Sequence, residues 1–192
     1  GLRRADVLVS ALPLARTASM QALELAALAA GSPALFPGDD VDAVARALNL
    51  VPATVLAVPA ATAARVVDDL DEAGARLGGT RVVLLVGAPS DDERAEVAEA
   101  LVRAGVDPAL LAVHAPDGHR LLWGECGAGF GLHTYPDLDL VHLVDPEGGG
   151  PADSGEVVLT QLGMRGSALL RYRTGDLAEG VETSRCPGCG RR

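Results

Sequence analysis

Lysine is absent from this chain of 192 residues, and all 16 of its basic residues are arginines. A mechanism that needs a lysine from within the chain, such as a phosphate-loop lysine or a Schiff base, is therefore excluded. Acidic residues number 26, which gives a formal net charge of −10. We expect no nucleic-acid partner, because binding along a phosphate backbone requires clustered cations.

Long apolar runs are missing too. None reaches the roughly 18 residues that a membrane span needs, and we expect no signal peptide, since no charged and then apolar segment opens the sequence. We therefore expect a soluble, cytoplasmic protein without a membrane partner. Aromatic residues make up only 3% of the chain, so they give little indication of which substrate it would take. The chain begins at Gly1 and ends just after a cysteine pair, and we expect a fragment of a longer protein.

Apolar residues nevertheless make up 48% of the sequence, enough for a core without disulfides. Short, near-continuous apolar runs are typical of strands buried on both faces of a parallel sheet, and amphipathic segments that open on Asp, Ser or Thr are typical of helices. Their alternation predicts an α/β fold, a parallel doubly wound sheet with flanking helices. The expected strands are 6–14, 32–37, 53–59, 80–87 and 109–115, and the expected helices are 17–31, 39–50, 62–78 and 90–106.

The pattern changes after His133. Segments 138–145, 155–162 and 167–174 have strand composition with no helix between them. They predict a small antiparallel β subdomain following the parallel sheet. We therefore expect an α/β subdomain at residues 1–133 and a β subdomain at residues 134–192. The sequence leaves the oligomeric state undetermined.

The cysteines suggest a metal site. Cys186 and Cys189 have the two-residue spacing that lets two thiolates reach one ion, although a redox pair is the alternative. Cys126 lies seven residues before His133 in a glycine-rich stretch, and the four residues together would make a closed Cys3His zinc site. The other histidines are spare candidates or surface residues: His114, His119 and His142.

Two further stretches admit a binding role or an ordinary structural one. Gly87 and Ala88 come where an expected strand ends and a helix begins, so they would either receive a flat base or form a plain turn capped by Ser90 or Asp91. Gly175 and Asp176 follow an expected strand. They would form either a β-turn or a rigid support for a carboxylate that accepts hydrogen bonds from two adjacent hydroxyls.

The sequence context of the other carboxylates indicates structural roles. Asp137 and Asp139 are expected at a turn and a strand entry, and Asp145 at a hairpin loop. Glu125 is a possible magnesium ligand, but it sits beside Cys126 and would equally support a zinc loop.

The order "GLHTYPDLDLVHLVDPEGGGP", "GEVVLTQLGMRGSALLRYRTGDL" and "CPGCGR" resembles the phenylacetate-CoA ligase branch of the acyl-adenylate-forming enzymes. The resemblance is strong from Glu125 onward and loose before Thr80. It implies two half-reactions: a carboxylic acid attacks the α-phosphate of ATP to form an acyl-AMP, and the thiol of coenzyme A then displaces AMP. It also implies magnesium in the complete enzyme and a structural zinc at the Cys3His set.

Residue roles follow from the resemblance. Asp176 would hold the ribose hydroxyls, and Gly87 with Ala88 would receive the adenine. Three neighbours of Asp176 would build the wall around the nucleotide: Tyr172, Arg173 and Thr174.

The family's phosphate loop and its C-terminal domain with a lysine have no counterpart here, and its Tyr-Gly-x-Ser/Thr-Glu motif is missing near residues 113–125. They would belong to N- and C-terminal regions of the same enzyme. We therefore expect the isolated chain to bind nucleotide weakly and not to turn over. Two alternatives stay open: a non-catalytic relative that binds AMP or acyl-AMP, and a zinc-stapled interaction module.

Overall fold

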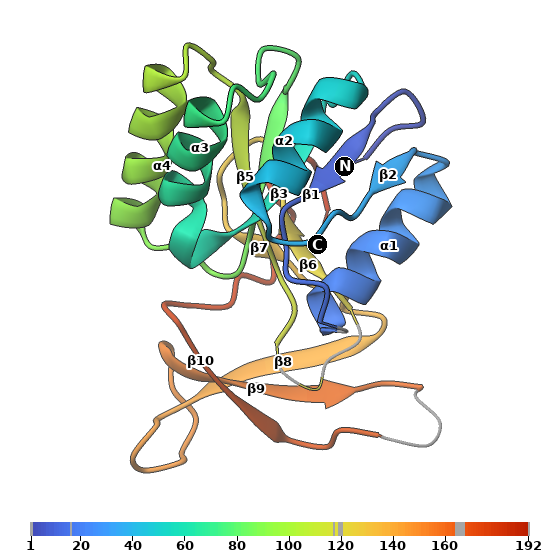
Figure 1. Ribbon diagram of the computed structural model, residues 1–192. Helices are drawn as coiled ribbons and strands as arrows, with labels where there is room; N and C mark the ends of the chain where they lie inside the picture. The colour runs from blue at the N-terminus through green and yellow to red at the C-terminus, as the bar shows by residue number, and fades with distance from the viewer. Residues whose placement is uncertain (1, 16, 117, 119–120, 164–167, 192) are drawn as a thin grey trace. The chain divides into compact units, whose positions relative to one another are not determined.

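A computed structural model describes residues 2–15, 17–116, 118, 121–163 and 168–191 (Figure 1). The chain divides into two compact units. The first comprises Gly1–Ala115 with His119–Leu132, and the second comprises Pro116–Gly118 with His133–Arg192.

A seven-stranded sheet organises the first unit, in the order β2-β1-β3-β4-β5-β6-β7. The first five strands of this order run parallel, and β6 is antiparallel to β5. The expected α/β fold is confirmed. The strands are β1 (Leu8–Ser10), β2 (Ala34–Leu35), β3 (Val55–Pro59), β4 (Val82–Val86), β5 (Ala109–His114), β6 (Trp123–Glu125) and β7 (Leu132–His133). The helices are α1 (Ala18–Ala30), α2 (Val41–Leu50), α3 (Ala63–Glu72) and α4 (Asp91–Arg103), with a 3-10 turn at Ala60–Thr62.

The helices begin where side chains satisfy their first amides. The side chains of Thr17, Asp40 and Ser90 accept hydrogen bonds from backbone N–H groups of α1, α2 and α4. Ser90 and Glu93 bond reciprocally, a capping box that fixes the first turn of α4. Gly31 ends α1 in the left-handed conformation, with φ of 65°. These helices therefore begin at the Asp, Ser and Thr residues that the sequence predicts as caps.

Helices pack on both faces of the sheet. On one face, α2, α3 and α4 bury their apolar residues against Val9, Leu56 and Leu85. On the other face, α1 packs against Leu8 and neighbouring strand residues. Leu8 and Val9 are adjacent and fully buried on opposite faces, which explains why the strands read as continuous apolar runs.

The second unit contains a three-stranded antiparallel sheet in the order β10-β9-β8. Its strands are β8 (Asp139–Val144), β9 (Gly155–Gln161) and β10 (Tyr172–Ala178). Residues 145–150 form the connection from β8 towards β9, with the Asp145 carboxylate accepting the Glu147 amide hydrogen bond. The expected turn at Asp137 and strand entry at Asp139 are also found.

Two expectations need correction. The strand expected at 167–174 starts at Tyr172 and continues to Ala178, so Gly175 and Asp176 lie inside it and form neither a β-turn nor a strand end. The segment 164–167 lies outside the described residues. In addition, the sequence did not predict β6 and β7, because runs of three and two residues show too little periodicity to detect.

Among the described residues, no helix is both long and apolar enough to cross a membrane.

Candidate metal centre and bulged strand

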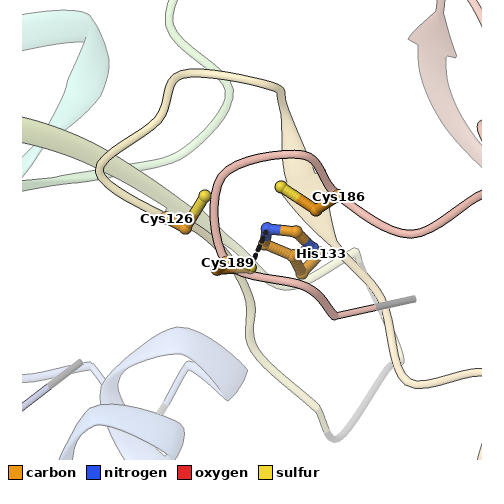
Figure 2. A group of neighbouring side chains, drawn as sticks. All are labelled: Cys126, His133, Cys186 and Cys189. Carbon is orange, nitrogen blue, oxygen red and sulfur yellow. Dashed lines mark hydrogen bonds between the residues drawn. The ribbon is translucent and has the colours of Figure 1, made fainter.

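Cys126, His133, Cys186 and Cys189 form one cluster (Figure 2). One potential ligand atom from each lies within 4.8 Å of the others. His133 Nε2 is 3.4 Å from Cys189 Sγ. The structure therefore brings together all four residues that the sequence singled out.

Local backbone geometry brings these side chains into position. Cys126 follows β6 directly and His133 lies in β7, so the connection must reverse within six residues. Gly129 and Gly131 allow this with φ of 70° and 87°, in the left-handed region that glycine favours. In the cysteine pair, the Gly190 amide donates to the Cys186 carbonyl at 2.9 Å, which closes a tight turn.

These dimensions fit zinc. Metal–sulfur bonds of about 2.3 Å and metal–nitrogen bonds of about 2.0 Å in a tetrahedron require S–S edges near 3.8 Å and N–S edges near 3.5 Å. The cluster is compact enough to meet these edges with small side-chain movements. A set of four protein ligands leaves no open coordination position, which is typical of a structural site. His114 and His142 are not members of the cluster, and His119 lies outside the described residues.

Glu125, next to this cluster, has a structural environment. One carboxylate oxygen accepts from Arg94 Nη2 at 2.5 Å, and the other accepts from the Ala112 backbone amide at 2.6 Å. The Glu125 side chain is only 10% exposed. Both oxygens are thus engaged within the protein, which favours the supporting role over magnesium ligation.

Gly87 and Ala88 lie at the carboxyl end of β4, where parallel sheets commonly bind ligands. Gly87 has φ of 133°, and a Cβ there would come 3.2 Å from the Ala60 side chain. Its amide donates to the Val113 carbonyl at 2.9 Å. Glycine at position 87 is therefore explained by packing alone, and Ser90 rather than Asp91 caps the helix that follows.

The stretch from Tyr172 to Asp176 forms a bulged strand. Between Arg173 and Leu177 the pairing with β9 shifts, so four steps along β10 match two steps along β9. Gly175 occupies this bulge with φ of 81°. Tyr172, Thr174 and Asp176 alternate with more exposed residues and share one half-buried face.

Glu156 on β9 holds the bulge in place. Its carboxylate pairs with the Arg173 guanidinium and accepts the Gly175 amide at 3.1 Å. Hydrogen bonding from Arg173, followed by that from Gly175, lowers the pKa of Glu156 below its usual value. Arg173 also donates to the Pro146 carbonyl at 2.8 Å, so it contacts the protein rather than forming a wall on the face of Asp176.

Thr174 also holds the bulge in place. Its hydroxyl donates to the Val157 carbonyl at 3.2 Å and accepts the Asp176 amide at 3.1 Å. The backbone amides of Gly175 and Asp176 are thus both held by side-chain bonds. Sequence reasoning missed Glu156, and the available signal was a glutamate directly before the apolar run Val157–Leu159.

No protein-family model matches the sequence, and neither does any curated protein. Solved structures do match. An open conformation of 2-hydroxyisobutyryl-CoA ligase in complex with 2-HIB-AMP and CoA aligns with a TM-score of 0.75 at 15% identity, over 92% of this chain and 41% of that chain. The chain has the fold of the part of this ligase that it covers.

Other matched structures share this fold. The N-terminal subdomain of Klebsiella oxytoca NpsA aligns with a TM-score of 0.61 at 18% identity, over 92% of this chain and 51% of that one. The anthranilate CoA ligase AuaEII in complex with anthranoyl-AMP gives 0.55 at 19% identity, over 84% of this chain and 32% of that one. The chain thus spans between about a third and a half of the matched structures.

Proposed function

We propose that this chain is the nucleotide-facing part of an AMP-forming acyl- or aryl-CoA ligase of the phenylacetate-CoA ligase branch. The complete enzyme would adenylate a small carboxylic acid with ATP and transfer the acyl group to coenzyme A. The observation that carries the proposal is the bulge at Thr174–Asp176, where an otherwise regular strand is distorted and then held by Glu156 and Thr174. Distortion fixed by side-chain bonds in this way is characteristic of functional positions.

Asp176 would accept hydrogen bonds from the two ribose hydroxyls, since a carboxylate offers two acceptor oxygens in one plane. Tyr172 and Thr174, on the same face of β10, would contact the nucleotide. Gly87 and Ala88 would receive the adenine at the carboxyl end of β4, where the backbone carries little side-chain bulk. Arg173 would act indirectly by holding Glu156.

Zinc bound by Cys126, His133, Cys186 and Cys189 would be structural, because four protein ligands leave no position for substrate. Charge stabilisation during phosphoryl transfer would need magnesium and a lysine, and this chain has no lysine. The isolated chain would therefore bind AMP weakly and not turn over.

Nuclear magnetic resonance titration with AMP tests the nucleotide site, because it detects weak binding. We expect saturable shifts of the Thr174, Gly175 and Asp176 amides in the wild type and their loss in Asp176→Ala. Asp137→Ala is the matched control, since Asp137 is an exposed carboxylate in a turn of the same unit. Equal AMP binding by wild type and Asp176→Ala would refute the ribose role.

Elemental analysis after purification in chelator-treated buffer tests the metal site independently. We expect about one zinc per chain in the wild type and none in Cys186→Ser, because loss of one of four ligands greatly weakens a structural site. A folded wild type without zinc would contradict this part of the proposal.

A second candidate is a non-catalytic relative that binds AMP or acyl-AMP. The engagement of both Glu125 oxygens by Arg94 and Ala112 favours it, because that carboxylate is then not available to a magnesium ion. Adenylation assays on the full-length protein separate the candidates. If zinc is present while AMP binding is absent, the chain is better described as a zinc-stapled interaction module.

A further inference from the structure

The Glu125 carboxylate occupies the place where the β5–β6 ladder ends. Val113 pairs with Gly124 and His114 pairs with Trp123, so the same register sets Ala112 opposite Glu125. At that position the Ala112 amide donates to the Glu125 side chain at 2.6 Å. The side chain thus closes the ladder one residue before Cys126 and fixes the backbone from which the metal loop departs.

Arg94 holds this carboxylate from helix α4. The Arg94 side chain is 27% exposed and that of Glu125 is 10% exposed, so the pair is partly shielded from water and salt. Arg94 lies one turn after the Ser90 cap, in a helix whose start is fixed by the capping box. The carboxylate is therefore anchored to a helix at one oxygen and to a strand at the other.

The loop that follows needs such an anchor. Gly127, Gly129 and Gly131 separate Cys126 from His133, and glycine loses the most conformational freedom when it is ordered. A metal ion that had to order this loop without a fixed starting point would bind more weakly. Neighbouring groups that orient metal ligands typically change metal affinity by about 10-fold to 100-fold.

We propose that Glu125, held by Arg94, is a positioning residue that fixes Cys126 for metal binding, and that bound metal in turn stabilises the Arg94–Glu125–Ala112 link. The inference rests on the proposed zinc site. The coupling must act in both directions. If the Arg94–Glu125 contact strengthens zinc binding, then bound zinc must stabilise that contact by the same free energy. Zinc occupancy is thereby linked to helix α4, which begins three residues after Ala88.

The experiment compares zinc affinities of Arg94→Met and Arg103→Met by competition with a chromophoric chelator. Arg103 is the matched control, because it lies in the same helix and pairs with Asp68 at 2.8 Å. Each substitution removes one positive charge, so the two variants have the same net charge. We expect about 10-fold weaker zinc binding in Arg94→Met and unchanged binding in Arg103→Met.

Glu125→Gln gives a second variant, which keeps an acceptor oxygen for Ala112 but weakens the bond to Arg94. Its zinc affinity should fall in the same direction. Hydrogen exchange at the Ala112 amide separates the positioning role from a structural role that is independent of metal. Zinc should slow this exchange in the wild type and should not slow it in Cys186→Ser.

The possible results are distinct. A folded wild type that binds no zinc would overturn the metal site and this inference together. Zinc binding that is equal in wild type, Arg94→Met and Glu125→Gln would overturn the positioning role alone. If Glu125→Gln fails to fold, Arg94→Met decides, because partly exposed Arg94 leaves room for an unbranched apolar side chain.

Discussion

The two sheets carry their buried charges in different places. In the seven-stranded sheet, Asp6 and Arg81 pair just before β1 and β4 begin, and the five parallel strands themselves contain no Asp, Glu or Arg. In the three-stranded sheet, Glu156 and Arg173 pair in the middle of the β9–β10 ladder. Strands covered by helices on both faces exclude charge, because burial of an ion is costly. In β10, half-buried positions alternate with exposed ones, so a charged pair can form there at lower cost. This pair, Glu156 and Arg173, holds the bulge.

Truncation of a core leucine should produce the largest contrast between the sheets. Leu85 on β4 is fully buried, whereas Leu177 on β10 is 73% exposed. We expect Leu85→Ala to lower the free energy of unfolding by about 2–5 kcal/mol, and Leu177→Ala to change it by about 0.5 kcal/mol or less. Urea unfolding measures both free energies. Fluorescence of Trp123, the single tryptophan, follows unfolding of the Leu85→Ala variant, and circular dichroism follows unfolding of both variants. Similar losses in the two variants would contradict the contrast.

The charged pair at the amino ends of the strands should have the next largest effect. Asp6 is 3% exposed, and its carboxylate accepts bonds from Arg81, Arg3 and Thr54. The Arg81 hydrogen bond is the main cause that lowers the pKa of Asp6 from 3.8 to about 2. A difference of this size corresponds to about 2 kcal/mol of stability.

Because the folded-state pKa is the lower one, this stability is present above pH 4 and is lost as the pH falls towards 2. Asp6→Asn should therefore be less stable than wild type at pH 7, and the difference should shrink between pH 4 and pH 2. Urea unfolding across this range measures it. A difference that stays constant down to pH 2 would show that the ionised carboxylate is not its source.

A smaller and local effect is expected from Glu156→Gln in the β9–β10 ladder. The variant should speed hydrogen exchange at the Gly175 amide, because Gly175 donates to the Glu156 carboxylate. In the wild type the pKa of Glu156 is lowered, so protection should persist below the usual titration range of glutamate and disappear only at lower pH.

Glu182→Gln is the matched control, since Glu182 also accepts a backbone amide bond, from Ser184. It should leave exchange at Gly175 unchanged. Equal protection of Gly175 in wild type and Glu156→Gln would mean that the bulge does not depend on this carboxylate.

The difference between the sheets also explains which parts of the structure were predictable. Apolar runs such as 55–59 and 82–86 identify buried parallel strands, because both of their faces must avoid water. The bulge at Gly175 was not predictable, since it depends on the Glu156 carboxylate of another strand. The same holds for Glu125, whose partners Arg94 and Ala112 lie 31 and 13 residues away in the chain.

The sequence alone predicted the order of the five parallel strands and four helices, the residue types that cap the helices, and the two spaced ligand pairs Cys126/His133 and Cys186/Cys189. Those features depend on local periodicity, capping chemistry and ligand spacing, which neighbouring residues in the chain specify. Only the tertiary structure decided that β10 runs through Asp176, that Arg173 pairs with Glu156, and that the Ala112 amide donates to the Glu125 carboxylate. These depend on pairing between distant segments, where several partners of equal chemistry exist in the sequence and three-dimensional packing selects one.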